Sequence, residues 1–458
     1  MVTCGLTKDT HNVLHFEDNE FEHISSQACI KKVSVAKIEN LNKKYESLGW
    51  KFKTLKVSFF QSGGDFGGML LNFPYYAIQN HSLNVIANRF FASPDLNILC
   101  SAWNAPAANP ILRFGLELIS TRIATKRQIF FRKYFPYFTF DSVQKPDFKD
   151  SIEECISNFK SEMLEWDIFA PRRNYEQQGL LKATVLCNHK MGKSPLSALP
   201  VSQKANKTVI LYCGGGGFVA DLQLIQEKFL KQWVKNTDVT IYEIHYGLAP
   251  KQQYPAPIND AFNLYMQIVL YHRVVMNEPD TKFILMGDSA GGKIALSVMN
   301  LLAHLDMFIP QTVFGIYPPT DMRQKRFTPS MVHSLDDKLL YFTVAKTCAQ
   351  AYVGDNPQDW DNDWLLSPVL ATNEIIQRYP KTILTAGEKD TLRDDNLQLI
   401  YKIKMAGKSP AEFIEVEGLY HGFLGFWLPL HLGVNDVTKF HDLVEEYIKK
   451  MITEPLRK

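Results

Sequence analysis

Gly287-Asp288-Ser289-Ala290-Gly291-Gly292 is the stretch around which the chain is organised. It follows the apolar, strand-length segment Lys282-Phe283-Ile284-Leu285-Met286 and precedes residues 293–302, which are long enough for a helix. A strand, Gly-x-Ser-x-Gly and a helix in this order predict a sharp turn that lifts the Ser289 hydroxyl clear of a sheet. The glycines on either side of Ser289 leave room for that turn, because a Cβ would block it.

The nucleophilic interpretation of Ser289 competes with a simpler one, in which a glycine-rich turn carries an ordinary serine. Gly-x-Ser-x-Gly alone is only moderately specific, so the choice depends on what else the chain offers. A nucleophilic serine needs an oxyanion-stabilising loop, a base and an acid. Candidates for all three occur along the chain, and in this interpretation the Ala290 N–H faces the developing oxyanion.

Composition limits the class of protein. With 458 residues, 46% of them hydrophobic, the chain can bury a large core in two domains or in one extended domain. A net charge of +2 gives no argument for nucleic-acid binding. The chain has no run of about 18 uncharged apolar residues, so no transmembrane helix is expected. Residues 1–20 carry several charges and lack the apolar core of a signal peptide. The seven cysteines contain no C-x-x-C pair, which favours reduced thiols, a cytoplasmic location and no zinc site.

The chain divides by its pattern into two regions. Residues 1–160 are expected to form an N-terminal, largely helical region, with helical segments at 21–48 and in parts of 84–131. Residues 161–458 are expected to form the catalytic domain. Strands and helices alternate there, which predicts a mostly parallel sheet flanked by helices, with functional loops at the carboxyl ends of the strands. The expected strands are 208–213, 239–245, 282–286, 312–317, 382–386 and 412–416, and the expected helices are 222–235, 258–276, 293–302, 394–405 and 437–451.

Residues 129–140, Ile-Phe-Phe-Arg-Lys-Tyr-Phe-Pro-Tyr-Phe-Thr-Phe, are aromatic and basic. Such residues favour membrane interfaces, so one interpretation is a peripheral contact with a lipid droplet or membrane, or the lining of an acyl site. The other is core packing of a helical extension. We favour packing, since Pro136 argues against one continuous amphipathic helix here.

A second motif, Tyr212-Cys213-Gly214-Gly215-Gly216-Gly217-Phe218, directly follows an expected strand. Four glycines let backbone N–H groups approach a substrate closely. Together with the Ala290 N–H, those of Gly215 and Gly216 are the expected oxyanion-hole donors. The alternatives are a flexible turn or a phosphate loop, and the lack of Gly-Lys-Ser/Thr argues against a phosphate loop.

The candidate acid and base lie after the next strands. Asp390 ends the segment Gly387-Glu388-Lys389-Asp390 at the end of a strand. Asp394 and Asp395 are rivals, but they fall in the first turn of a helix, where acidic side chains complement the helix dipole.

The candidate base is His421 in Gly418-Leu419-Tyr420-His421-Gly422-Phe423, a loop beside glycine that core packing explains poorly. His245, by contrast, ends a strand, and His272 and His304 lie in predicted helices. The order Ser289, Asp390, His421 is that of α/β-hydrolases.

These motifs together resemble the hormone-sensitive lipase group of α/β-hydrolases over about residues 208–430. The family's His-Gly-Gly-Gly loop corresponds to residues 214–217, with Gly214 in place of the histidine. Its Gly-x-x-Asp-Pro-Leu-Arg-Asp segment corresponds to 387–394, with Thr391 in place of proline, and its His-Gly-Phe to 421–423. In the family that histidine supports the loop from behind, so a histidine at Gly214 is expected to leave activity equal or higher.

The resemblance implies an α/β-hydrolase fold with an N-terminal helical extension and a cap, for which residues 318–366 are the candidate. The aromatic residues of this candidate cap either line an acyl pocket or pack; they are Tyr341, Phe342, Tyr352, Trp360 and Trp364.

The same resemblance implies a serine esterase or lipase of lipid metabolism that cleaves a small-molecule or lipid ester through an acyl-enzyme intermediate. Ser289 is then the nucleophile, His421 the base and Asp390 the residue that orients it, with no metal or cofactor. Two alternatives stay open: a deacetylase of small esters or amides, and a non-catalytic ligand receptor on the same fold. His421 argues against the receptor, whereas Gly214 in place of the family's histidine keeps that alternative open.

Overall fold

The computed structural model describes most of residues 120–456, with gaps at 164–178, 190–206, 324–325, 334–336, 338–339, 355–360 and 427–434. Before residue 120 it describes three short strands and residues 96–97, 100–101 and 103–104. The helix expected at 21–48, most of the N-terminal region and Trp360 lie outside the described residues.

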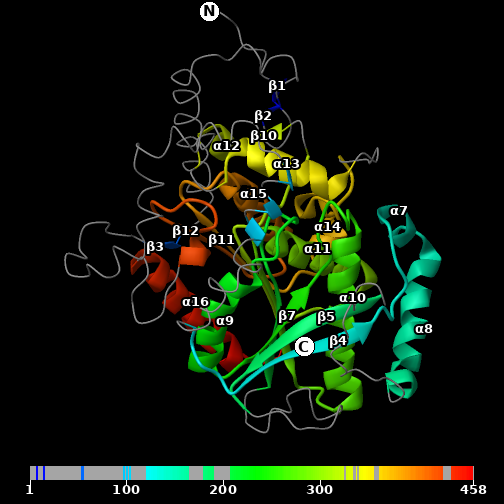
Figure 1. Cartoon of the computed structure of the whole chain (residues 1–458). Helices are drawn as coiled ribbons and strands as arrows, with labels where there is room; N and C mark the ends of the chain where they lie inside the picture. Colours follow the sequence, from blue (N-terminus) through cyan, green and yellow to red (C-terminus); the bar gives the residue numbers. More distant parts are fainter. Residues whose placement is uncertain are drawn as a thin grey trace, which may run out of the picture.

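A sheet of nine strands forms the centre of the described part of the chain (Figure 1). Seven neighbouring strands are parallel, and the two at one edge are antiparallel, which confirms the mostly parallel sheet. In spatial order they are β3 (Lys53–Leu55), β12 (Ala411–Val416), β11 (Lys381–Gly387), β9 (Thr312–Ile316), β8 (Lys282–Asp288), β6 (Thr208–Cys213), β7 (Thr240–His245), β5 (Leu180–Cys187) and β4 (Thr125–Arg132). A separate small antiparallel sheet joins β1 (Thr7–Lys8), β2 (Leu14–His15) and β10 (Arg326–Phe327).

Helices cover both faces of the large sheet, because its central strands are apolar on both sides. On one face lie α10 (Ala256–Leu270), which continues as a π-helix over Tyr271–Val275, α11 (Ser289–Leu305), α14 (Asn373–Ile376) and α15 (Arg393–Ala406). On the other lie α9 (Gln223–Thr237) and α16 (Asn435–Thr453), whose Trp233 and Phe440 belong to a second buried cluster. The strands and helices expected after residue 208 are confirmed to within a few residues.

The helical interpretation of residues 129–140 is wrong. Residues 125–132 form β4, which pairs antiparallel with β5, and exposure alternates along its first half as a strand at a sheet edge requires. The segment that follows is held by α10: the Asn263 side chain accepts from the backbone N–H groups of Tyr134 and Phe135, and that of Asn259 from the N–H of Phe138. Sequence reasoning failed here because the partner strand and α10 are distant in the chain.

The aromatic side chains of this stretch mostly pack in the core. Ile129, Phe131, Phe135 and Phe138 are buried, whereas Tyr137 is 61% exposed. This burial is what the packing interpretation predicts. The division of the chain at residue 160 stays a prediction, with β4 on its N-terminal side and already part of the sheet.

Two further pairs of helices belong to the described part of the chain. After β4 in the chain, α7 (Phe140–Val143) begins at Thr139, whose hydroxyl accepts from the Ser142 N–H in a capping box, and α8 (Pro146–Met163) follows it. Within the candidate cap lie α12 (Pro329–His333) and α13 (Phe342–Val353). Figure 1 shows α7 and α8 at one side of the molecule and α12 and α13 at another.

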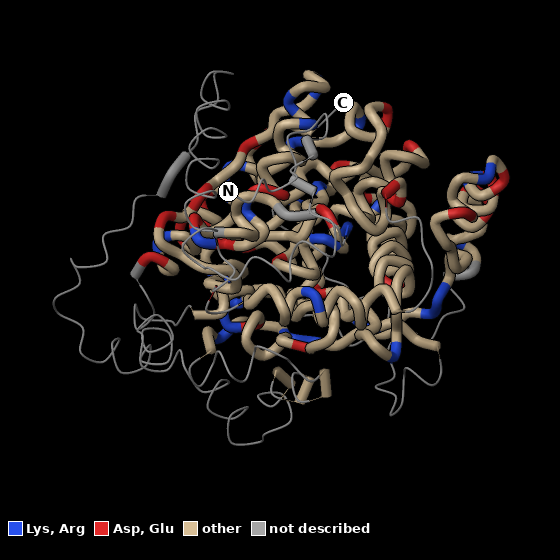
Figure 2. Tube along the Cα trace, turned by 90° about the horizontal axis from the view of Figure 1, so that it is seen from above, with Lys and Arg blue, Asp and Glu red and all other residues tan. Residues whose placement is uncertain are grey.

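Charged residues of both signs are distributed over the described part of the chain (Figure 2). In Figure 2 Lys and Arg positions alternate with Asp and Glu positions along the described trace. Among the described helices, none is long and apolar enough to cross a membrane.

Candidate active site

The predicted sharp turn at Ser289 is confirmed. Ser289 follows β8 as the first residue of α11, and its φ of +50° lies in the left-handed region that non-glycine residues rarely adopt. A Cβ built at Gly287 would lie 2.7 Å from the Cys213 carbonyl oxygen, and one at Gly291 only 2.1 Å from it. The turn is therefore pressed against the end of β6, and only glycine fits at both positions.

The Ser289 hydroxyl, the His421 ring and the Asp390 carboxylate form a continuous hydrogen-bonded chain. Ser289 Oγ lies 2.8 Å from His421 Nε2, and His421 Nδ1 lies 3.0 and 3.2 Å from the two oxygens of Asp390. Because a carboxylate only accepts, the Nδ1–H donates to Asp390, which leaves Nε2 to accept from the serine hydroxyl. His421 is 5% exposed and Asp390 is fully buried.

The sheet brings Asp390 and His421 together. Their loops follow the neighbouring parallel strands β11 and β12, whose carboxyl ends meet at the same edge. The Glu388 N–H donates to the Val416 carbonyl and the Lys389 N–H to that of Leu419, so the two loops continue the pairing of the strands. Asp390 is further held by the Leu392 N–H, which donates to its Oδ1 at 2.8 Å.

The rival residues have other partners. Asp394 accepts from the Ser330 N–H and pairs with the guanidinium of Arg393. Asp395 lies in the first turn of α15, as predicted. Among the other histidines, His245 lies against the Thr184 hydroxyl, His272 between Tyr242 and Glu278, and His304 against the Val143 carbonyl.

Two opposing effects set the pKa of His421. Burial lowers the pKa of the ring. The charge and hydrogen bond of Asp390 raise this pKa, with smaller contributions from Asp337 and Asp288, and together they outweigh the effect of burial. The net pKa of His421 is therefore above its ordinary value of about 6.5.

This shift predicts the pH dependence of any reaction in which His421 acts as a base. Only the neutral ring accepts a proton, so kcat/KM should rise with pH and level off above an inflection that is higher than about pH 6.5. The profile should be measured by pH-stat titration of a soluble ester, so that detection does not itself depend on pH. An inflection well below pH 6 would show that Asp390 does not stabilise the imidazolium.

One of the three expected oxyanion donors has a different partner in the structure. The Gly215 N–H donates to Asp288 Oδ1 at 2.8 Å, so this donor is committed to a carboxylate and is not available to an oxyanion. Asp288 Oδ1 also accepts from the Tyr212 hydroxyl at 2.6 Å. The expectation for Gly215 is therefore wrong in this conformation, because Asp288, the residue just before the serine, reaches back to the loop. Gly216, with φ +139°, and Ala290 carry no such bond among those of the described residues.

Sequence reasoning missed a buried lysine beneath this loop. Lys293 is fully buried one helical turn after Ser289, and its ammonium group lies over the rings of Phe218, Tyr254 and Tyr352 and donates to the Tyr352 hydroxyl at 3.0 Å. Burial lowers the pKa of Lys293 to about 7. The spacing of four residues on one helix was the only signal in the sequence.

The same contacts decide how the candidate cap lies. Tyr352 of α13 stacks on Phe218 with ring centroids 4.0 Å apart, so α13 packs against the end of the glycine loop. Tyr341 and Trp364 are buried as well. These three aromatic residues of the candidate cap are packed, which was the second of the two interpretations.

Comparison with known proteins agrees with this fold. A family described as "alpha/beta hydrolase fold" matches residues 210–425. Esterase LipI of Mycobacterium tuberculosis is 30% identical over 229 residues, 49% of this chain and 68% of that protein. Hormone-sensitive lipase of Homo sapiens is 29% identical over 202 residues, 44% of this chain and 18% of that protein. This chain thus covers less than a quarter of the length of the hormone-sensitive lipases of man and mouse.

Among solved structures, the thermophilic carboxylesterase EstE1 from a metagenomic library matches 79% of this chain and 99% of its own, with a TM-score of 0.56 and 20% identity. LAE6, an alpha/beta hydrolase enzyme from the metagenome of Lake Arreo, matches 84% and 97% with a TM-score of 0.55 and 19% identity. Both likenesses concern the fold. Fold, site order and relatives together show that the chain belongs to the hormone-sensitive lipase-like family of α/β-hydrolases.

Proposed function

We propose that this protein is a serine hydrolase that cleaves carboxylic esters, small-molecule or lipid, through Ser289, His421 and Asp390. The observation that carries the proposal is the hydrogen-bonded chain from the Ser289 hydroxyl through the His421 ring to the buried Asp390 carboxylate. A serine hydroxyl is a weak nucleophile at its own pKa, and this arrangement supplies the base it needs.

The reaction follows from the positions of the protons. His421 Nε2 takes the hydroxyl proton as Ser289 Oγ attacks the ester carbonyl carbon, and Asp390 stabilises the imidazolium that forms. The imidazolium then gives this proton to the departing alkoxide, and the alcohol leaves an acyl group on Ser289. A water molecule then attacks the acyl carbonyl carbon while His421 takes a proton from it, and the imidazolium returns this proton to Ser289 Oγ as the acid leaves.

The oxyanion of both tetrahedral intermediates needs preorganised donors. Because the Gly215 N–H is bound to Asp288, we assign this role to the N–H groups of Gly216, Gly217 and Ala290. Ala290 begins the helix that Ser289 opens, so the partial positive charge of that helix terminus adds to its donor.

A panel of p-nitrophenyl esters from acetate to palmitate tests the proposal. We expect hydrolysis of part of the panel at more than about ten times the rate of the buffer, with a chain-length profile that separates esterase from lipase. A fluorophosphonate probe should label Ser289 of the wild-type chain. Folded protein that neither hydrolyses any of these esters nor takes up the probe would instead be a receptor on this fold.

A further inference from the structure

The glycine loop is held by a glutamine side chain from α9. Gln226 is 4% exposed, and its Nε2 donates to the Gly215 carbonyl oxygen at 3.3 Å and to Asp288 Oδ1 at 3.1 Å. This amide therefore bridges the loop and the residue before Ser289. With the Tyr212 hydroxyl and the Gly215 N–H, it is the third donor to the same carboxylate oxygen.

The bond to the Gly215 carbonyl also sets the direction of the next donor. The Gly215 carbonyl and the Gly216 N–H belong to one planar peptide group, in which the oxygen and the hydrogen point in opposite directions. Fixing the oxygen on the α9 side therefore turns the Gly216 N–H away from α9. The preceding peptide is fixed in the same way, because the Tyr246 hydroxyl donates to the Gly214 carbonyl at 2.5 Å and the Gly215 N–H donates to Asp288.

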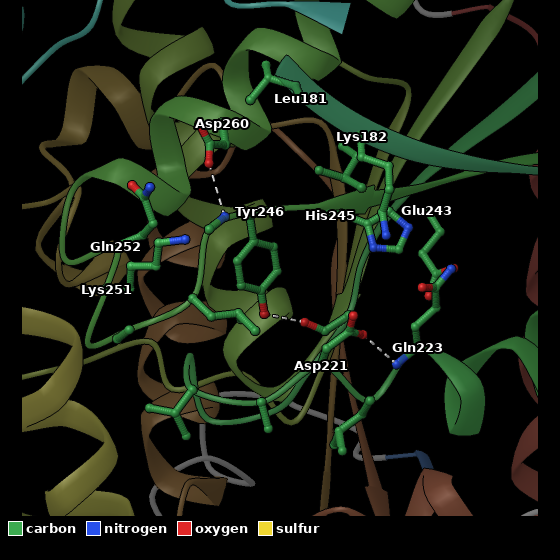
Figure 3. A pocket seen from close by; sticks show the side chains of 18 of the residues that line it. Leu181, Lys182, Asp221, Gln223, Glu243, His245, Tyr246, Lys251, Gln252 and Asp260 are labelled. Carbon is green, nitrogen blue, oxygen red and sulfur yellow. Dashed lines mark hydrogen bonds between the residues drawn. The ribbon is translucent and has the colours of Figure 1, made fainter. Parts of the chain in front are cut away.

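Packing around the loop is incomplete on the α9 side. A cavity of about 360 Å³ adjoins it there, and Gly214, Gly215 and Gln226 are among its lining residues, whereas Ser289 and His421 are not. Figure 3 shows Tyr246 in this cavity with its hydroxyl at the end of a dashed hydrogen bond. A loop of glycines beside a cavity has no side chains to anchor it, so its orientation depends on hydrogen bonds.

The same glutamine explains why residue 214 is glycine. A Cβ built at Gly214 would lie 2.4 Å from Gln226 Oε1, so no side chain can start there while Gln226 keeps its position. The backbone of Gly214 is outside the left-handed region, so space alone excludes the Cβ. A histidine at Gly214 would also displace Gln226, so the expectation of equal or higher activity requires that the imidazole replace the hydrogen bonds of the glutamine.

We infer that Gln226 is a positioning residue, which aims the Gly216 N–H at the oxyanion by holding the Gly215 carbonyl and Asp288. The inference rests on the proposed ester hydrolysis. In this inference a side chain of α9 holds the loop in place, because the four glycines of the loop have no side chains of their own to do so.

The test is a double-mutant cycle of Gln226→Met and Gly214→Ala. Methionine keeps the volume but cannot donate, and alanine at 214 pushes the amide away. Each variant should lower kcat by at least about 10-fold, but by less than the 10²- to 10³-fold loss that follows removal of a whole oxyanion donor. KM should change by less than about 3-fold. Affinity for a trifluoromethyl ketone, which forms a tetrahedral adduct with the serine, should fall by the same factor as kcat.

Because both substitutions remove one set of contacts, the double variant should lose little more than either single variant. Gln223→Met is the matched control. Gln223 is half-buried on the same helix and lines the same cavity, but it bonds to Thr184 and Glu227 and not to the loop. The kcat of this variant should stay within about 2-fold of the wild type. Thermal unfolding of every variant checks that the fold is retained.

The outcomes separate the two claims. A wild-type chain with no Ser289-dependent ester hydrolysis overturns the proposed function and this inference with it. An active wild type whose Gln226→Met variant keeps both kcat and ketone affinity overturns the inference alone. The inference is likewise overturned if Gln226→Met and Gln223→Met lose kcat equally, or if the effects of Gln226→Met and Gly214→Ala multiply.

Discussion

Ser289→Ala is expected to lower kcat by about 10⁴- to 10⁶-fold on every ester that the wild-type chain accepts. The variant loses the attacking oxygen, so no acyl-enzyme can form, and only binding and the oxyanion donors remain. Fluorophosphonate labelling should disappear with the activity. Stability should change little, because serine and alanine carry the same cost of the left-handed backbone at this position.

Ser297→Ala provides the matched control for this prediction. Ser297 lies on α11 like Ser289 and is buried, but its hydroxyl lies 2.6 Å from the carbonyl oxygen of Leu365 and 3.0 Å from that of Lys293, which share its one hydrogen. Its loss should lower the free energy of unfolding by about 1 kcal/mol and leave kcat within a few-fold. If Ser289→Ala retained more than a hundredth of the activity, another nucleophile would have to carry the reaction.

Asp390→Asn is expected to lower kcat by about 10⁴-fold at neutral pH. The asparagine can still accept from the Leu392 N–H, but it can present an N–H to His421 Nδ1. The ring then keeps its proton on Nε2, facing Ser289, and cannot accept another. The charge that raises the pKa of His421 is lost as well.

Asp394→Asn distinguishes this role from a general effect of removing a nearby acid, because Asp394 lies four residues later in the first turn of α15. Asp394 is also buried, and its carboxylate accepts from the Ser330 N–H and pairs with Arg393. We expect Asp394→Asn to lower stability while kcat stays within about 10-fold, since it touches neither His421 nor Ser289. Equal losses of kcat in the two variants, with both folded by circular dichroism, would contradict the assignment of Asp390.

Local chemistry made much of the site predictable. Gly-x-Ser-x-Gly between an apolar strand and a helix implied a turn too tight for a Cβ. The structure agrees, because a Cβ at Gly291 would lie 2.1 Å from the Cys213 carbonyl oxygen. Asp390 and His421 follow successive strands, and parallel neighbours bring their carboxyl ends together. A histidine and an aspartate so placed can meet without any information beyond strand order.

Contacts between distant segments were beyond such reasoning. Pairing with β5 sets the strand β4, and asparagines of α10 hold the segment after it, whereas the same residues read alone as part of a helical extension. The Gly215 N–H had the right position in the motif, yet its partner is Asp288, far along the chain. Which backbone N–H of the loop can bind an oxyanion therefore depends on which of them the folded structure pairs with a side chain.

The sequence by itself determined the sheet that alternates with helices, the strained serine turn and the order of nucleophile, acid and base, because these depend on short-range sterics and on strand order. Only the tertiary structure decided how the glycine loop is held. Gln226 of α9 and Tyr246 after β7 reach the loop only in the folded chain. Residue 214 has no room for a side chain because Gln226 lies beside it, and no local sequence pattern predicts that contact. Hydrogen bonds between residues far apart in the chain have no period or spacing, so a motif cannot encode them.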